Sequence, residues 1–270
     1  MSEVAGRAFD LLESVAGSKT PMGLMAIAQR TGIDKTTASR LLRFLEGRRF
    51  VIRDEETQRY DVGPALMILA ATAMSRSDLL VAARLHFPLL RQMTGETVSV
   101  HLRVDLERVC LGGLESEQSV RSAVTSGERR EVFRGASGKT ILAYMPEGDQ
   151  IRALEMAAQH GTALEPLKAQ LREIRLHGGH RGISDRVEGL NAVSAPIFDV
   201  NGVVGALTVS GPSHRWTDAR MAQCYPQLMS IAQHISAELG NQSSRAASQH
   251  DRTSLVANKR LRNEAPTTSA

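Results

Sequence analysis

The stretch 22–49 constrains this fold more than any other, because it predicts two short helices joined at a glycine turn. Thr31-Gly32 is expected to end the first helix, since glycine readily takes the left-handed conformation that closes a helix. Asp34 is expected to cap the second helix. That helix has an apolar stripe at the i, i+3, i+4, i+7 spacing of an amphipathic helix, formed by Ala38, Leu41, Leu42 and Leu45.

The opposite face of the second helix carries Thr36, Arg40 and Arg43. Two short helices of which the second presents Arg and Thr outward are typical of a helix-turn-helix, whose second helix enters the major groove of DNA. Residues 50–53 and 59–62 follow as β-like runs around a polar turn, which predicts a wing. An ordinary α-hairpin with a solvated outer face is the alternative interpretation, and the hairpin that follows favours the DNA-binding one.

Eight polar residues of this region are the candidate DNA contacts. Thr36, Thr37 and Arg40 are expected to approach base edges, where sequence is read. The others are expected to meet backbone phosphates or a minor groove from the helix and the wing, and they are Lys35, Arg43, Arg53, Gln58 and Arg59.

Length and composition bound the remaining possibilities. A chain of 270 residues predicts about two domains. The pI of about 9.4 is a weak sign of nucleic-acid binding, because most of the net charge of +4 comes from residues 241–270. That tail lacks apolar periodicity, which predicts disorder. We expect a cytoplasmic protein without a membrane partner. No signal peptide is seen, and the apolar run at 65–74 has only half the length of a bilayer span. The two cysteines lie far apart, which fits a reducing compartment.

From residue 78 onward the pattern predicts an α+β domain in which helices bracket an antiparallel sheet. Asn201-Gly202 sits at the favoured position of a hairpin turn. Gly178, Gly179 and Gly182 predict a loose connection, and 127–130 a polar loop. The expected strands are 97–104, 108–114, 192–198 and 203–210, and the expected helices are 79–93, one from about 136, 149–158, 164–176 and 216–239.

Two apparent motifs are discarded. The run G-A-S-G-K-T at 135–140 lacks the first glycine of a phosphate-binding loop, because Phe133 stands there. It is interpreted as a helix N-terminus, whose free N–H groups suit an anion. His177 and His180 flank two glycines without a Cys or carboxylate at ligand spacing, so no metal is expected. Neither a catalytic set nor a cofactor motif stands out.

Five segments, in order, resemble the IclR family of bacterial transcription regulators. The resemblance covers about 4–239 and rests on the winged stretch and on the runs 54–66, 135–143, 188–196 and 205–212. It implies a winged helix-turn-helix (1–63), a linker helix (64–77) and a GAF-like α/β effector domain (78–240) before the tail (241–270). Family members are typically dimers or dimers of dimers that bind a small, often acidic, metabolite.

The resemblance also places an effector site. Thr208 and Ser210 share one strand face, and their hydroxyls either are satisfied by backbone or point into a ligand cavity. Arg49 stands where members commonly have Gly, and it is expected either to contact a phosphate or to be solvated. Ala192 stands where many members have Cys, which favours a larger or more apolar acid. The candidate effector residues are Gly135, Ala136, Ser137, Ala192, Thr208 and Ser210.

These observations predict a transcription regulator that reads a pseudo-palindromic operator as a homo-oligomer and responds to a small organic acid. The alternatives are an α+β enzyme with an accessory winged domain and a protein-binding adaptor. The lack of a catalytic constellation disfavours the enzyme. Outward arginines beside a wing favour DNA over a protein partner.

Overall fold

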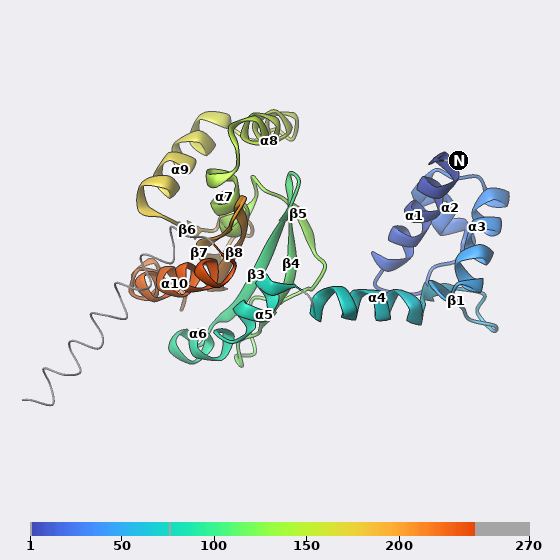
Figure 1. The fold of residues 1–270 in the computed structure, drawn as a ribbon, viewed down its shortest axis with the longest axis horizontal. Coiled ribbons are helices and arrows are strands. Elements are labelled where there is room, and N and C mark those ends of the chain that lie inside the picture. The colour runs from blue at the N-terminus through green and yellow to red at the C-terminus, as the bar shows by residue number, and fades with distance from the viewer. Residues whose placement is uncertain (1, 76, 241–270) are drawn as a thin grey trace, which may run out of the picture. The chain divides into compact units, whose positions relative to one another are not determined.

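The computed structural model describes residues 2–75 and 77–240 of the chain, so the expected tail at 241–270 lies outside the described residues. The chain divides into two compact units, Met1–Ser77 and Asp78–Ala270. Figure 1 shows the helices and strands of both units.

The first unit is a three-helix bundle with a hairpin. Its core holds Leu11, Ile27, Leu42 and Tyr60, all at most 2% exposed. The elements are α1 (Ser2–Ala16), α2 (Leu24–Thr31), α3 (Lys35–Gly47), β1 (Val51–Arg53), β2 (Tyr60–Val62) and α4 (Pro64–Ser75). The predicted helix-turn-helix and wing are therefore present in the predicted order.

Local signals set the turn between α2 and α3. Gly32 closes α2 with a φ of 68°, and the Asp34 carboxylate accepts the Thr37 N–H at 2.9 Å, as the capping prediction required. This hydrogen bond lowers the pKa of Asp34. The helix α2 begins only at Leu24, so residues 20–23 lie before it. Met22 instead exchanges two backbone hydrogen bonds with Tyr60, at 2.9 and 2.8 Å, and extends the wing.

The helix α4 is apolar and largely exposed. Met67 and Ile68 are each 65% exposed and Leu69 is 55% exposed. Within the described residues, no single helix is long and apolar enough to cross a membrane. Residues 64–74 and 78–84 pass that test, by length and composition only, when they are taken together as a bent pair.

The second unit is built on one six-stranded antiparallel sheet in the order β5-β4-β3-β8-β7-β6. Strands β3 and β4 form one hairpin and strands β7 and β8 form another. The two hairpins join where β3 pairs with β8. The strands are β3 (Thr97–Val104), β4 (Glu107–Leu114), β5 (Arg129–Glu131), β6 (His180–Ile183), β7 (Leu190–Asp199) and β8 (Gly202–Pro212).

Helices cover both faces of this sheet, as Figure 1 shows. The helices α5 (Asp78–Arg84), α6 (Phe87–Thr94) and α10 (Asp218–Glu238) lie on one face. The helix α7 (Gly135–Tyr144) packs against β7 and β8 on the other face, with α8 (Glu147–Gln159) and α9 (Leu164–His177) outside it. The fold is the predicted α+β arrangement with an antiparallel sheet.

Three local predictions in this unit are wrong. The single helix at 79–93 is two helices, and Pro88 falls in the first turn of α6, where a proline is tolerated because its missing N–H would have no intrahelical acceptor. The polar loop at 127–130 contributes Arg129 and Arg130 to strand β5. The loose glycine connection contains strand β6. Both missed strands are short and polar and lie at the sheet edges, where pairing with a neighbour and not an apolar pattern decides them.

Candidate functional site

The exposed face of α3 carries the predicted DNA contacts. Lys35, Thr36, Arg40 and Arg43 are exposed, while Thr37 is half-buried beside the Asp34 cap. Over residues 2–75 and 77–240, neither Arg40 nor Arg43 forms an ion pair, so both guanidinium groups are available to a nucleic acid. The sequence pattern placed these side chains correctly because α3 keeps the helical period throughout.

The wing residues are exposed, and several of them form contacts within the first unit. The Asp54 carboxylate accepts the Thr57 N–H at 2.7 Å and stabilises the turn. Gln58 has a φ of 57° and donates its side-chain amide to the Glu55 carbonyl. The Arg59 guanidinium donates to the Pro21 carbonyl at 3.1 Å, and Arg53 stacks over Tyr60. Arg53 and Arg59 are thus positioned by the wing itself.

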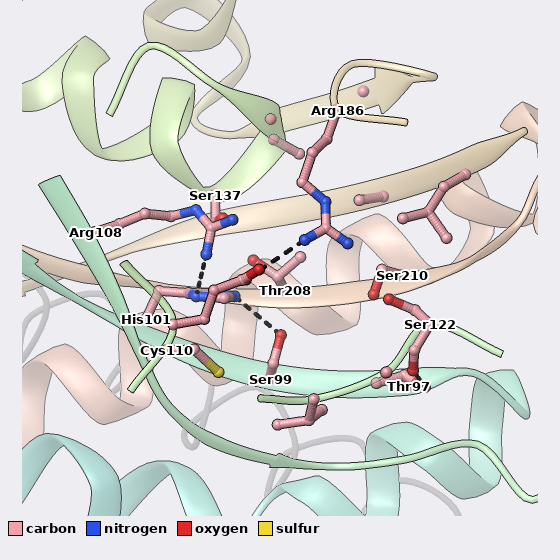
Figure 2. A pocket seen from close by; sticks show the side chains of 18 of the residues that line it. Thr97, Ser99, His101, Arg108, Cys110, Ser122, Ser137, Arg186, Thr208 and Ser210 are labelled. Carbon is pink, nitrogen blue, oxygen red and sulfur yellow. Dashed lines mark hydrogen bonds and ion pairs between the residues drawn. The ribbon is translucent and has the colours of Figure 1, made fainter. Parts of the chain in front are cut away.

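The second unit contains a cavity between the sheet and the N-terminus of α7 (Figure 2). Its empty space amounts to about 590 Å³ when the open solvent at its mouth is included. All six residues predicted for the effector line it, namely Gly135, Ala136, Ser137, Ala192, Thr208 and Ser210.

Strand register brings the sheet residues of the cavity together. Ser210 pairs with Thr97 on one side and with Ala192 on the other. Thr208 pairs in the same way with Ser99, and its hydroxyl oxygen lies 3.0 Å from that of Ser194. Alternate residues of a strand share a face. Thr97 and Ser99 therefore form one row along the cavity floor, and Thr208 and Ser210 form the adjacent row.

The N-terminus of α7 forms the opposite wall. Arg134 precedes it without a side-chain cap, and the first N–H groups of a helix have no intrahelical acceptor. Gly135 has a φ of +71°, and a Cβ there would meet the Cβ of Arg186 at 3.4 Å. Glycine therefore allows both the turn into α7 and the close approach of the 186 side chain.

The most charged part of the cavity was missed by sequence reasoning. Arg108 on β4 is only 3% exposed, and its guanidinium contacts Nδ1 of His101 at 2.9 Å. The other ring nitrogen of His101 lies 3.0 Å from the Ser99 hydroxyl. The alternation of β4 was an available signal, since Arg108 is two positions from Cys110 and shares the face of that small residue, which is also 3% exposed.

Burial and charge set the protonation of these groups. Burial and the positive charges of Arg108 and Arg186 hold the pKa of His101 well below its usual value near 6.5. Burial lowers the pKa of Arg108 to about 10, opposed by nearby Glu128. At neutral pH His101 is therefore neutral and Arg108 is charged. A guanidinium can only donate, so Nδ1 of His101 accepts and its Nε2–H donates to Ser99.

A second charged group borders the cavity on the loop before β7. Asp185 accepts from His180 at 2.6 Å and pairs with Lys139 at 2.9 Å. Although burial raises the pKa of Asp185, hydrogen bonds and charges from these partners lower it overall. Arg186 pairs with Glu128 at 3.5 Å. In the described part of the chain no cluster of three or more His, Cys, Asp or Glu could hold a metal ion, and His177 pairs with Glu173.

A winged helix-turn-helix together with a separate unit that holds a polar ligand cavity defines the class of ligand-responsive DNA-binding regulators. The chain matches the family model described as the IclR helix-turn-helix domain over residues 4–55. It matches the model described as the bacterial transcriptional regulator IclR C-terminal domain over residues 71–237. The chain belongs to the IclR family, and it is a DNA-binding transcriptional regulator.

Individual relatives agree with this assignment. The HTH-type transcriptional regulator BhcR of Paracoccus denitrificans is 32% identical over 240 residues, 85% of either chain. The regulator KdgR of Escherichia coli is 26% identical, over 87% of this chain and 91% of its own. The crystal structure of an IclR transcriptional regulator from Alicyclobacillus acidocaldarius has a TM-score of 0.78 at 27% identity and covers 88% of this chain and 99% of its own. These names favour a regulator over the enzyme and adaptor alternatives.

A more distant structure shares the fold. It is an IclR homolog of Microbacterium hydrocarbonoxydans complexed with 4-hydroxybenzoate, 19% identical with a TM-score of 0.74. It covers 87% of this chain and 98% of its own.

Proposed function

We infer that this regulator reads its operator through α3 and the wing, and that a small organic carboxylate bound in the cavity changes its DNA affinity. The observation that carries the carboxylate is the convergence of donors on one cavity. The hydroxyls of Thr208 and Ser210 face it from the sheet, and the first N–H groups of α7 face it from the other wall. Such donors and the positive end of a helix suit a carboxylate.

The chemistry of one relative supports this class of ligand. The 4-hydroxybenzoate complexed with the Microbacterium hydrocarbonoxydans homolog is an organic acid. Ala192 supplies neither bulk nor a thiol beside Ser210, which leaves room for an acid with an aromatic or branched body. The ligand acts on DNA binding only to the extent that it prefers one conformation of the protein.

The proposed regulator works as a homo-oligomer in the cytoplasm. The apolar residues of α4 are exposed in the single chain, and burying them against a second copy would remove this surface from water. A two-fold protein matches a pseudo-palindromic operator. We keep the division into a DNA-binding domain (1–63), a linker helix (64–77) and an effector domain (78–240) as part of this proposal.

The test has two stages. DNA selected from a random pool by the full chain defines the operator, and we expect a two-fold motif. Small organic acids are then screened by thermal shift, in which a true ligand raises the midpoint with concentration. The acids that pass are titrated into the protein–operator complex, followed by fluorescence anisotropy. Selection that returns no motif would contradict the DNA assignment, and acids that stabilise the protein without changing DNA affinity would contradict the effector assignment.

A further inference from the structure

The helix α3 carries an exposed phenylalanine in line with two of its candidate DNA contacts. Phe44 is 57% exposed. It follows Thr36 and Arg40 in steps of four residues, so the three side chains form one ridge of the helix. All three residues are exposed, whereas the opposite face of α3 is buried in the core of the first unit. Phe44 therefore continues the row of side chains that are predicted to approach base edges.

The length of this ridge corresponds to several base pairs. Thr36 and Phe44 are eight positions apart, which is about 12 Å along a helix at ~1.5 Å per residue. Successive phosphates of one DNA strand lie about 3.4 Å apart along the duplex axis, so the ridge spans about three to four base steps when α3 lies along the major groove. Phe44 then reaches a base pair beyond the one that Arg40 contacts.

The exposed neighbours of Phe44 on α3 are basic. Arg48, four residues further on, places its guanidinium carbon 5.3 Å from the centre of the Phe44 ring, which is a cation–π contact. Arg40 precedes the ring by four residues and is exposed. A docking face for another protein is a contiguous apolar patch, and a single ring between two arginines does not form one on α3. The same arrangement suits DNA, because arginines bind phosphates and base edges and the ring can meet an apolar group between them.

Gly47 leaves the surface beside Phe44 open. It lies three residues after Phe44 and is exposed on the same side of α3. Among the described residues, a Cβ added to Gly47 would meet nothing within 4 Å. The left-handed residue that ends α3 is Arg49 and not Gly47, so the turn does not require a glycine at 47. Since glycine destabilises a helix relative to alanine, its use here fits a close approach of DNA to this face.

We propose that Phe44 reads a thymine of the operator by packing its ring against the C5-methyl group of that base. This methyl is the apolar group that distinguishes an A·T pair in the major groove. The inference rests on the proposed function, because it requires α3 to enter that groove. Arg40 supplies hydrogen bonds to a neighbouring base pair, and Arg48 holds the ring from the side of the phosphates.

Replacing thymine by deoxyuridine tests this contact, because it removes only the methyl group. The operator is the one that the full chain selects from a random pool, and its thymines are replaced one at a time. Fluorescence anisotropy measures the affinity for each duplex. We expect at least one position in each half-site where the wild type binds about threefold to tenfold more weakly without the methyl. Phe44→Ala should bind the unmodified operator more weakly by a similar factor and should not respond to deoxyuridine at that position.

Matched variants separate this contact from a general loss of apolar surface. Met25→Ala removes another exposed apolar side chain of the first unit, on α2, and should keep the wild-type response to deoxyuridine. Phe44→Gln keeps a good helix former but loses the ring, and it decides if Phe44→Ala does not fold. An operator without thymine in its half-sites, or a wild type that ignores every methyl, would overturn the proposal. So would a methyl effect that persists in the Phe44 variants or disappears in Met25→Ala.

The failure of this inference is distinguishable from failure of the proposed function. A chain that selects an operator and loses specificity in Arg40→Ala, but does not respond to deoxyuridine, refutes only the assignment to Phe44. A chain that selects no DNA motif refutes the DNA part of the proposed function, and this inference with it.

Discussion

The hydroxyl oxygens of Ser194 and Thr208 lie 3.0 Å apart across β7 and β8. One of the two must donate to the other, so this buried pair offers at most one O–H to a ligand. The hydroxyl of Ser210, two positions further along β8, has no hydrogen-bond partner among the described residues, and Ser210 lines the same cavity. The ligand-facing donors of the sheet are therefore unequal: Thr208 is tied to its neighbour and Ser210 is free.

Replacing Thr208 and Ser210 together by Ala should abolish the effector response and preserve operator affinity. The double variant removes the hydroxyl donors of β8, while α3 and the wing are untouched. Anisotropy of the protein–operator complex during titration with the acid measures both properties. Ser194→Ala is the matched control, because it removes the neighbour of Thr208 but leaves both ligand-facing hydroxyls. An unchanged half-saturation in the double variant would place the effector elsewhere.

Arg40→Ala should cost about 1–3 kcal/mol on the selected operator and relax its sequence preference, because a base-edge contact is lost. Arg59→Ala should weaken all sequences alike and reduce the salt slope by about one unit, because a phosphate contact is lost. Both are measured by anisotropy at several salt concentrations. Arg7→Ala on α1 serves as the control, since Arg7 is already paired with Glu3. Intact specificity in Arg40→Ala would refute the recognition-helix assignment.

Arg49→Gly should stabilise the first unit by about 0.5–1 kcal/mol. Arg49 has a φ of 59° at the end of α3, where the N–H groups of Arg49 and Phe50 bond back to the carbonyls of Glu46 and Leu45. This is a Schellman ending, which favours Gly because a Cβ is strained there. The greater freedom of Gly in the unfolded chain offsets part of the gain.

Hydrogen exchange of the α3 amides measures this effect in the full chain, with slower exchange expected in Arg49→Gly. Gly63→Ala is the opposite control, because a Cβ there would meet the Arg49 carbonyl oxygen and should speed exchange. Faster exchange in Arg49→Gly would show that the arginine side chain contributes more than its backbone strain costs.

His101 should make the second unit less stable as pH falls below about 6.5. Its folded-state pKa lies below the unfolded value near 6.5. Between these two pKa values, the unfolded chain binds a proton at His101 and the folded chain does not. Stability then falls with pH by up to about 1.4 kcal/mol per unit. The groups facing His101 are Arg108, Arg186 and Glu128, and the arginines oppose its protonation.

Denaturant unfolding of wild type and His101→Gln between pH 7.5 and 5 isolates this contribution, since other groups titrate in both proteins. A glutamine can accept from Arg108 and donate to Ser99 without titrating. As the pH falls, the free energy of unfolding of the wild type should decrease relative to that of His101→Gln. Parallel pH profiles would contradict a buried neutral histidine.

Ile68→Lys should weaken self-association at least tenfold, because a charge in the proposed α4 interface would have to be buried. Sedimentation at micromolar concentration measures the change. Leu176→Lys is the control, because Leu176 is 75% exposed on α9, outside the proposed interface. A wild-type chain that sediments as a monomer would contradict the proposed interface.

Short-range patterns in the sequence determined much of this protein. The Asp34 cap, the Gly32 turn, the stripe of α3 and the Asn201-Gly202 hairpin follow from interactions over a few residues. The alternation of β8 determined that Thr208 and Ser210 share a face. The discarded phosphate-loop motif was interpreted as a helix start, and Gly135 begins α7.

Only the tertiary structure decided the rest, because it depends on pairing between distant segments. The edge strands β5 and β6 exist through their partners β4 and β7 and carry little apolar pattern of their own. The contact between His101 and Arg108 depends on the register of β3 and β4, which shifts at an irregularity beside Val100 and His101. The ion pairs of Glu128 with Arg130 and Arg186, and of Asp185 with Lys139, also depend on which segments the fold brings together. A charge is costly or useful according to its burial and its partners, and both are set by the fold.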